Sequence, residues 1–257
     1  MKHADRFCLS GKIALVLGGS SGIGRQIALG FHDAGAVVLA VGRTAAKVAE
    51  VDGALAARGA KIKGYCVDVT QPEELSGLIR RAIKEHERIN ILVNSQGITM
   101  LKPAEEFSRS DYDQLIATNL TSVFFACTEV GRHMLEQGSG SIINIASVGA
   151  HRGIQLSALY TMSKHGVLAL TRTLGAEWAT RGVRVNAISP GFFMTALNRD
   201  KMSPQRKETA MRRTPMKRFG ELDELVGAAI FLASASASYV TGESVAVDGG
   251  FLAAGLD

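Results

Sequence analysis

Cysteine and proline are scarce in this chain, which has three cysteines and five prolines among 257 residues. The cysteines, Cys8, Cys66 and Cys127, are odd in number and lack the spacing of metal ligands. This argues against a disulfide scaffold and against a metal site. Unpaired cysteines are typical of reducing compartments, so we expect buried, reduced thiols in a cytoplasmic protein.

Long hydrophobic runs, internal repeats and flexible linkers are also missing. Residues 1–12 contain no apolar run, so we expect no signal peptide. The apolar stretches are no longer than a strand, which predicts no transmembrane helix. Apolar residues make up 46% of the chain, enough for a buried core. The sequence therefore predicts one domain spanning residues 1–257.

Short β-branched runs alternate with longer segments of helical periodicity along the whole chain. Several runs are apolar on successive residues, as in parallel strands covered on both faces. The expected strands are Ile13–Leu17, Val37–Val41, Lys61–Val67, Ile91–Asn94, Ser141–Ile145, Arg184–Ile188 and Ser244–Val247. The expected helices are Ile23–Ala34, Ala45–Arg58, Pro72–His86 (opened by a Thr70–Glu73 capping box), Asp111–Leu135, Ala158–Thr180 and Glu221–Leu232. This alternation predicts an α/β fold: a single doubly wound, Rossmann-like domain with a seven-stranded parallel sheet flanked by helices.

A glycine-rich turn follows the first expected strand. It reads Gly18-Gly19-Ser20-Ser21-Gly22-Ile23-Gly24 and leads directly into a helix. Such glycines let the backbone approach a pyrophosphate, whose charge then faces the helix N-terminus. A tight turn without a ligand would use similar residues. The strand–helix–strand context favours the nucleotide site.

The end of the second expected strand indicates which dinucleotide binds. A NAD site normally has Asp or Glu there to hold the ribose hydroxyls. This chain has Gly42 followed by Arg43, with Lys47 one helical turn further. A cation without a carboxylate beside it favours a 2′-phosphate, and so NADP(H), with NAD(H) as the alternative. An exposed arginine that merely opens a helix would give the same pattern.

Tyr160 and Lys164 stand four residues apart, on one face of an expected helix. A nearby ammonium stabilises phenolate and lowers the pKa of a tyrosine from about 10 towards that of a useful acid or base. Ser147 lies just past an expected strand, where its hydroxyl can orient a substrate carbonyl. Taken singly, a surface Tyr–Lys pair and a serine helix cap would look the same.

Together these features resemble the short-chain dehydrogenase/reductase family over essentially the whole chain. The family's catalytic residues match Asn119, Ser147, Tyr160 and Lys164. The resemblance implies cofactor contacts from the glycine-rich turn and from the segments that end later strands. The implied cofactor-binding residues are Gly18, Ser20, Ser21, Gly22, Ile23, Gly24, Arg43, Asp68, Val69, Asn94, Gly97, Tyr160, Lys164, Pro190, Gly191, Phe193 and Thr195.

The resemblance also implies a mechanism and an assembly. In the reductive direction Ser147 binds the substrate oxygen, Tyr160 donates the proton, and nicotinamide delivers hydride to the carbonyl carbon. Lys164 binds the nicotinamide ribose, and Asn119 holds a water that links it to solvent. Family members pair through their two long helices, so we expect a homodimer or homotetramer.

Three positions depart from the family pattern. Leu17 stands where the family usually has threonine, which removes one supporting hydrogen bond. Ser21 stands where NADP-preferring members often carry a basic residue. Gln96 replaces the usual alanine, and we expect it to reach towards the cofactor or the pocket.

Positive charge is concentrated between residues 194 and 220, which form the substrate lid in the resembled family. The whole chain has a net charge of +5. In this segment two acidic residues, Asp200 and Glu208, accompany eight basic ones, a net charge of +6. The basic residues are Arg199, Lys201, Arg206, Lys207, Arg212, Arg213, Lys217 and Arg218.

A cationic lid would attract an anionic substrate, although a solvated amphipathic helix would carry similar charges. Nucleic acid is disfavoured, because the cluster holds one aromatic residue, Phe219, and so offers no stacking platform. Arg152 follows Ser147 by five residues and is expected to pair with a carboxylate. The expected substrate-binding residues are Ser147, Arg152, Gln155, Tyr160 and Arg199.

Within the family, the segments 7–12 and 247–251 are similar to those of gluconate 5-dehydrogenase-like enzymes. We therefore expect an oxidoreductase that moves a hydride between NADP(H) and a small anionic carbonyl or alcohol, such as a keto-sugar acid. A 3-oxoacyl-carrier-protein reductase is the alternative with the same catalytic residues. A catalytically silent nucleotide-binding scaffold is the alternative of another class. We expect no metal, nucleic-acid or membrane partner.

Overall fold

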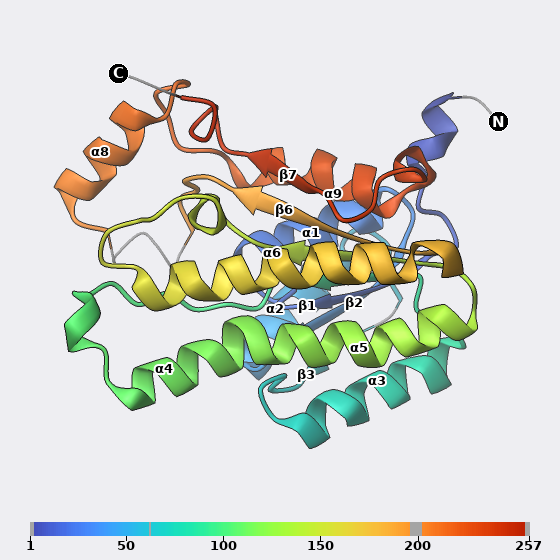
Figure 1. Cartoon of the computed structure of the whole chain (residues 1–257). Helices are drawn as coiled ribbons and strands as arrows, with labels where there is room; N and C mark the ends of the chain where they lie inside the picture. The colour runs from blue at the N-terminus through green and yellow to red at the C-terminus, as the bar shows by residue number, and fades with distance from the viewer. Residues whose placement is uncertain (1–2, 62, 196–201, 255–257) are drawn as a thin grey trace.

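The computed structural model describes residues 3–61, 63–195 and 202–254 (Figure 1). A seven-stranded sheet with the order β3-β2-β1-β4-β5-β6-β7 forms its centre, and every pair of neighbouring strands is parallel. The strands are β1 (Ile13–Leu17), β2 (Val37–Gly42), β3 (Tyr65–Cys66), β4 (Ile91–Asn94), β5 (Gly140–Ile145), β6 (Val183–Pro190) and β7 (Ser244–Val247). The predicted doubly wound parallel sheet is confirmed.

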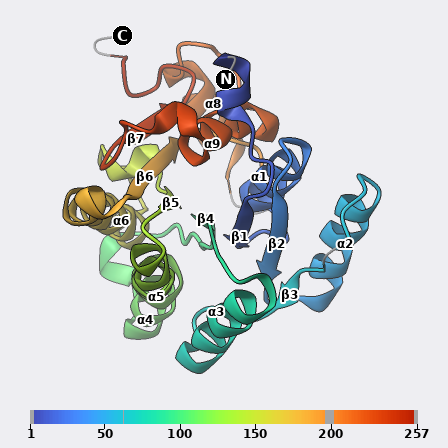
Figure 2. The ribbon, with the colours of Figure 1, turned by 90° about the vertical axis from the view of Figure 1, so that its right-hand side faces the viewer.

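Helices cover both faces of the sheet (Figure 2). Side chains of β1 alternate between the two cores, because successive residues of a strand point to opposite faces. One core includes α1 (Gly22–Asp33), α2 (Ala45–Ala56) and α9 (Val226–Ala233), and the other includes α3 (Pro72–His86), α5 (Ser122–Glu136) and α6 (Ala158–Trp178). The remaining helices of the described residues are α4 (Arg109–Ile116) and α8 (Pro204–Arg213), with 3-10 turns at His3–Phe7, Ala104–Glu106, Val148–Ala150, Ala179–Arg181, Leu222–Leu225 and Ala235–Ala237.

The third strand is much shorter than predicted. We expected residues 61–67, but among the described residues of that range only Tyr65 and Cys66 pair with β2. This strand lies at the edge of the sheet, and Lys61 and Lys63 beside it are exposed. Short, charged edges prevent further strands from adding to a sheet.

The long helix expected at residues 111–135 is divided. Between α4 and α5, the residues Ala117–Thr121 form one turn of π-helix. A π-turn holds an extra residue and therefore rotates the following side chains, and such turns are frequent at functional sites. The extra residue lies in the segment that contains Asn119.

The expected capping box at the start of α3 is wrong. The N-cap residue is Gln71, and Pro72 occupies the first turn. The Thr70 hydroxyl instead donates to Asp68 Oδ1 at 2.8 Å. A local side-chain hydrogen bond of this kind competes with helix capping.

The cysteines only partly match the expectation of buried thiols. Cys127 is buried, whereas Cys8 and Cys66 are exposed, and all three are free. Within the described ranges, no helix is both long and apolar enough to cross a membrane, and no three His, Cys, Asp or Glu side chains gather as metal ligands.

Candidate active site

A cavity of about 640 Å³ opens at the carboxyl ends of the strands. It lies where the strand order reverses between β1 and β4, the usual position of ligands in doubly wound sheets. The chain segments that leave β1, β2, β4, β5 and β6 all contribute to its wall. The predicted site residues that line it are Gly18, Ser20, Ser21, Gly22, Ile23, Arg43, Asp68, Val69, Gly97, Ser147, Tyr160, Lys164, Pro190, Gly191, Phe193 and Thr195.

The glycine-rich turn forms a cradle between β1 and α1. Gly18 has φ +75°, and a Cβ there would lie 2.7 Å from the backbone nitrogen of Gln96. Only glycine fits this approach of two chain segments. The first amides of a helix have no partner within the helix, so the start of α1 suits a phosphate. Gly24 lies behind the turn, against the Gly18 carbonyl.

The end of β2 leaves no room for the carboxylate of a NAD site. A Cβ on Gly42 would lie 2.0 Å from Ser20 Oγ. The side chains of Arg43 and Lys47 are exposed and line the same part of the cavity. Two cations and no carboxylate at this position suit a 2′-phosphate.

Ser147 follows β5 and has two functions in the structure. Its Oγ accepts a hydrogen bond from the Gly149 amide at 3.1 Å and so caps the 3-10 turn Val148–Ala150. The same residue lines the cavity beside Tyr160. Ser147 therefore caps the turn and lines the cavity at the same time, although the sequence presented these two roles as alternatives.

Tyr160 and Lys164 enter the cavity from one face of α6. Lys164 Nζ lies 5.8 Å from the centroid of the Tyr160 ring and donates to the Ile145 carbonyl at 2.7 Å. That hydrogen bond fixes the lysine against the end of β5. Three residues of the predicted catalytic group, Ser147, Tyr160 and Lys164, therefore line the same cavity.

The pKa of Tyr160 is shifted in the direction opposite to the one that the sequence predicted. Burial raises the pKa of Tyr160, and a hydrogen bond with Ser147 works against that rise. Burial also lowers the pKa of Lys164 to about 8. The expected lowering by Lys164 fails because both groups lose hydration, which disfavours phenolate and ammonium alike.

Asn119 is fully buried and holds the loop that follows β4. Its Oδ1 accepts from the Ile98 amide at 2.8 Å, and its Nδ2 donates to the Ile98 carbonyl at 3.0 Å. A Cβ on Gly97 would lie 3.5 Å from Asn119 Oδ1 and 3.7 Å from Lys164 Nζ. Asn119 and Lys164 therefore converge on Gly97, and the polar atoms of the asparagine side chain are engaged by Ile98.

Asn94 lies outside the described lining of the cavity, and its side chain links two strands of the sheet. Its Nδ2 donates to Asn144 Oδ1 at 2.8 Å, which links β4 to β5. Asn144 Nδ2 donates in turn to the Thr171 hydroxyl on α6 at 2.9 Å. The sequence did not single out Asn144 or Thr171, because a buried polar residue in a strand carries no signal of its partner.

Arg206, on α8, lines the same cavity as Tyr160. It is half-buried, and its guanidinium donates to the Gln155 carbonyl and the Ser157 hydroxyl, each at 3.3 Å. Among the described residues, no carboxylate forms an ion pair with it. Burial lowers its pKa, which remains that of a permanent cation.

The other expected substrate contacts lie elsewhere. Arg152 is exposed, and its guanidinium donates to the carbonyls of Leu252 and Ala254 at 2.7 and 3.1 Å. The Gln155 side chain is exposed, outside the described lining of the cavity. Arg199 lies outside the described residues.

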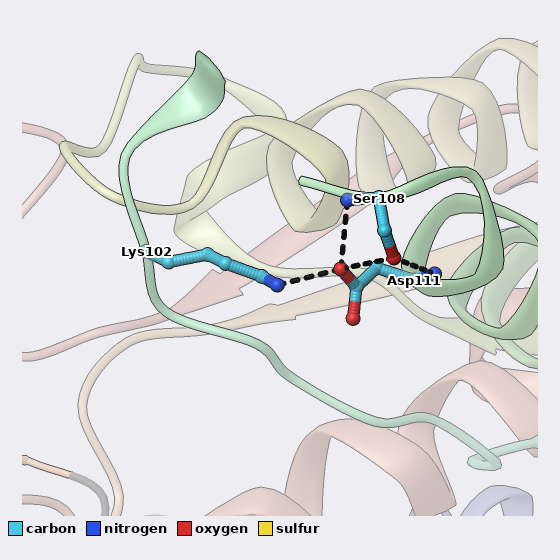
Figure 3. Close-up of polar contacts among 3 residues, drawn as sticks. All are labelled: Lys102, Ser108 and Asp111. Carbon is cyan, nitrogen blue, oxygen red and sulfur yellow. Dashed lines mark hydrogen bonds and ion pairs between the residues drawn. The ribbon is translucent and has the colours of Figure 1, made fainter. Parts of the chain in front are cut away.

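An ion pair fixes the loop that follows the cavity-lining residue Leu101. Figure 3 shows Lys102 and Ser108 converging on one carboxylate oxygen of Asp111, with Lys102 Nζ at 2.5 Å and Ser108 Oγ at 2.7 Å. Hydrogen bonds from Lys102 and Ser108 lower the pKa of Asp111 to about 2. The Lys102 amide also donates to the Leu156 carbonyl at 3.0 Å. The cluster therefore ties the loop after β4 to α4 and to the segment before α6.

Comparisons with known proteins agree with this geometry. A family model described as enoyl-(acyl carrier protein) reductase matches residues 18–252. The gluconate 5-dehydrogenase of Gluconobacter oxydans is 38% identical over 251 residues, which cover 97% of this chain and 98% of that protein. The 3-oxoacyl-(acyl-carrier-protein) reductase of Thermotoga maritima is 34% identical over 244 residues, covering 95% and 99%.

A solved structure matches over nearly the full length. The crystal structure of a gluconate 5-dehydrogenase from Burkholderia cenocepacia, in complex with NADP and tartrate, superposes with a TM-score of 0.94 at 37% identity. The match covers 98% of this chain and 100% of that chain.

Proposed function

The chain belongs to the short-chain dehydrogenase/reductase family of oxidoreductases that act on CH–OH groups, and we propose on that premise that it interconverts a keto-sugar acid and its alcohol with NADP(H). The observation that carries the proposal is Arg206, a cation without a carboxylate partner among the described residues, in the same cavity as Tyr160. The Gluconobacter and Burkholderia proteins are named for a sugar-acid substrate, which supports an anion at this place.

The residues around the cavity fit a nicotinamide dinucleotide. The Gly18 cradle accepts a pyrophosphate, and Arg43 with Lys47 suits a 2′-phosphate. Pro190, Gly191 and Thr195 line the wall of the same cavity after β6. When bound, the cofactor supplies or accepts the hydride.

The protein's own residues provide position and protons. Ser147 orients the substrate oxygen towards Tyr160. Because burial raises the pKa of Tyr160, the phenol is protonated at neutral pH and is ready to donate in the reductive direction. Lys164, fixed on the Ile145 carbonyl, lies behind the phenol and restores its proton. Asn119 holds Ile98, which lines the cavity next to Gly97.

The test combines two substrates with two arginine variants. We expect turnover of 5-keto-gluconate with NADPH, followed by nicotinamide absorbance, and a higher kcat/KM for NADPH than for NADH. Arg206→Met should raise KM for the keto-acid by about tenfold or more, because a charge-assisted hydrogen bond is lost. Arg213→Met is the matched control, since it removes the same charge from an exposed position of the same helix. Equal KM values in both variants would refute a direct contact.

A 3-oxoacyl-carrier-protein reductase is the second candidate, favoured by the Thermotoga relative. Turnover of an acetoacetyl thioester without turnover of 5-keto-gluconate would select it. Unchanged rates in Tyr160→Phe would contradict both enzymatic functions and leave a nucleotide-binding scaffold.

We also propose a homodimer or homotetramer, in the cytoplasm. Large apolar side chains on α4, α5 and α6 are exposed: Tyr112 at 38%, Phe124 at 44%, Phe125 at 46% and Met162 at 45%. Exposed apolar groups on adjacent helices are typical of a surface that another subunit covers.

A further inference from the structure

The residues that follow β7 turn back and lie beside the end of α8 (Figure 1). Asp248 shapes this segment, because its carboxylate accepts hydrogen bonds from the Gly250 amide at 2.9 Å and from the Leu252 amide at 2.8 Å. A short polar side chain that bonds the backbone a few residues later stabilises a turn. We call residues 248–254 the strap.

The strap packs closely against the chain that leaves α8. Gly249 has φ +61°, and a Cβ there would lie 2.8 Å from Thr214 Cγ2. The Gly249 carbonyl accepts a hydrogen bond from the Met216 amide at 3.1 Å. Only glycine allows this approach, since a side chain would collide with Thr214. The strap therefore supports the helix that carries Arg206, which lines the cavity.

The strap also supports an aromatic residue of the cavity wall. The ring of Phe251 meets the ring of Phe192 edge to face, with 5.2 Å between the centroids, and Phe192 lines the cavity. The Gly191 amide donates to the Val247 carbonyl at 2.9 Å, and a Cβ on Gly191 would lie 2.7 Å from Asp248 Cα. The wall after β6 is therefore held by the segment that contains the strap.

Arg152 anchors the strap. Its Nη2 donates to the carbonyls of Leu252 and Ala254 at 2.7 and 3.1 Å. Its guanidinium carbon lies 5.9 Å from the centroid of the Phe251 ring, within the range of a cation–π contact. Arg152 follows β5 and lies five residues after Ser147. It thus joins the strap to the segment that positions Ser147.

We propose that Arg152 is a positioning residue for the substrate. It holds the strap, and the strap holds Phe192 through the ring of Phe251, so that this part of the wall keeps the shape that the substrate requires. Arg152 itself lies outside the described lining of the cavity. The inference rests on the proposed function, because it concerns the substrate bound in that same cavity.

Loss of the anchor should affect the substrate more than the cofactor. We expect Arg152→Met to raise KM for 5-keto-gluconate by about tenfold, the loss of about one hydrogen bond's contribution to binding. The value of kcat and the Kd for NADP⁺ should each stay within about twofold of the wild-type values, because Phe192 contacts substrate and transition state alike. An unchanged KM would overturn the inference.

Phe251→Leu tests whether the anchor acts through the aromatic pair. This change removes the edge-to-face contact with Phe192 but no charge, so a KM raised as in Arg152→Met identifies position, and not charge, as the cause. Because both changes break the same series of contacts, the double variant should lose little more than either single variant. A normal KM in Phe251→Leu beside a raised KM in Arg152→Met would overturn the inference, since that result indicates a direct effect of the charge.

Hydrogen exchange followed by mass spectrometry reports on the strap without any substrate. The amides of Met216 and Leu252 both donate to the strap, so Arg152→Met should speed their exchange several-fold. Arg6→Met is the matched control, because the Arg6 guanidinium also donates to a carbonyl distant in sequence, that of Ala235, outside the described lining of the cavity. It should change neither this exchange nor KM.

The two proposals fail in different ways. Unchanged exchange at the strap in Arg152→Met would overturn the inference and leave the proposed function standing. A wild-type protein that reduces an acetoacetyl thioester but not 5-keto-gluconate would refute the sugar-acid function alone. The same variants measured with the thioester would then still test whether Arg152 positions the wall.

Discussion

Replacing Lys164 with methionine should stabilise the folded protein at neutral pH while abolishing turnover. Lys164 is 5% exposed, and burial lowers its pKa from 10.5 to about 8. A shift of this size corresponds to about 3 kcal/mol against the charged, folded form. Methionine has a similar shape, but it leaves the Ile145 carbonyl without its lysine donor, at a cost of about 1 kcal/mol. The net gain in the free energy of unfolding is about 2 kcal/mol.

The dependence on pH identifies the cause. Below pH 8 the lysine is protonated in both states, so the full cost of burying the charge is present. Between pH 8 and 10.5 the unfolded chain binds a proton that the folded protein lacks, so the stability of the wild-type protein rises with pH. Lys164→Met lacks this titration. Its advantage should therefore shrink as pH rises through that range.

Urea unfolding of both proteins between about pH 7 and about pH 10 checks this prediction. Lys12→Met, at an exposed position, is the control for the loss of one positive charge. A variant that is less stable than the wild-type protein at neutral pH, or an advantage that does not change with pH, would refute the reasoning.

Two other changes test the cofactor site and the assembly. Gly42→Asp should weaken both NADPH and NADH in fluorescence titrations, because its Cβ would lie 2.0 Å from Ser20 Oγ. Adding Ser20→Gly should restore NADH binding selectively, and failure to do so would contradict the steric explanation. Light scattering should give a dimer or tetramer, which Phe124→Asp with Phe125→Asp should dissociate; a wild-type monomer would contradict the proposed interface.

Local patterns predicted most of the sheet correctly. The bounds expected for β1, β4 and β7 are those of the structure. β1 and β4 are short runs of mainly buried apolar residues, and β7 has valine at alternate positions, so their own residues mark these strands. The third strand was predicted too long, because its extent depends on its position at the edge of the sheet rather than on its own residues.

The divided helix shows a different limit. Apolar residues continue with helical spacing from α4 into α5, so no change in the pattern marks the π-turn at Ala117–Thr121. The extra residue is retained by contacts distant in sequence, such as the pair of hydrogen bonds between Asn119 and Ile98. The sequence identified Asn119 through the family motif, but it could not predict what the side chain holds.

The two arginines illustrate how tertiary contacts decide the role of a charge. By sequence, Arg152 lay close to Ser147 and Arg206 lay in a cationic segment, and either was a candidate for the substrate. In the structure the carbonyls of Leu252 and Ala254 bind Arg152, about a hundred residues away along the chain. Arg206 makes three hydrogen bonds of 3.3 Å, two to the Gln155 carbonyl and one to the Ser157 hydroxyl. The partners of both arginines are neutral, so both keep their charge, but Arg206 lines the cavity, whereas Arg152 is exposed outside its described lining. An anionic substrate in the cavity therefore gains more from Arg206 than from Arg152.

The described part of the fold leaves buried polar atoms without partners both beside the cavity and away from it. Thr195 and Gln96 line the cavity, but Thr195 Oγ1 and Gln96 Oε1 are themselves buried and lack partners among the described residues. Each lowers the stability of the protein by itself, because burial removes water from a polar atom. Gln137 Oε1 shows that such an atom outside the cavity need not signal a ligand. A missing partner at a buried atom therefore does not by itself identify a ligand site, because a ligand in the cavity reaches only atoms that solvent can also reach.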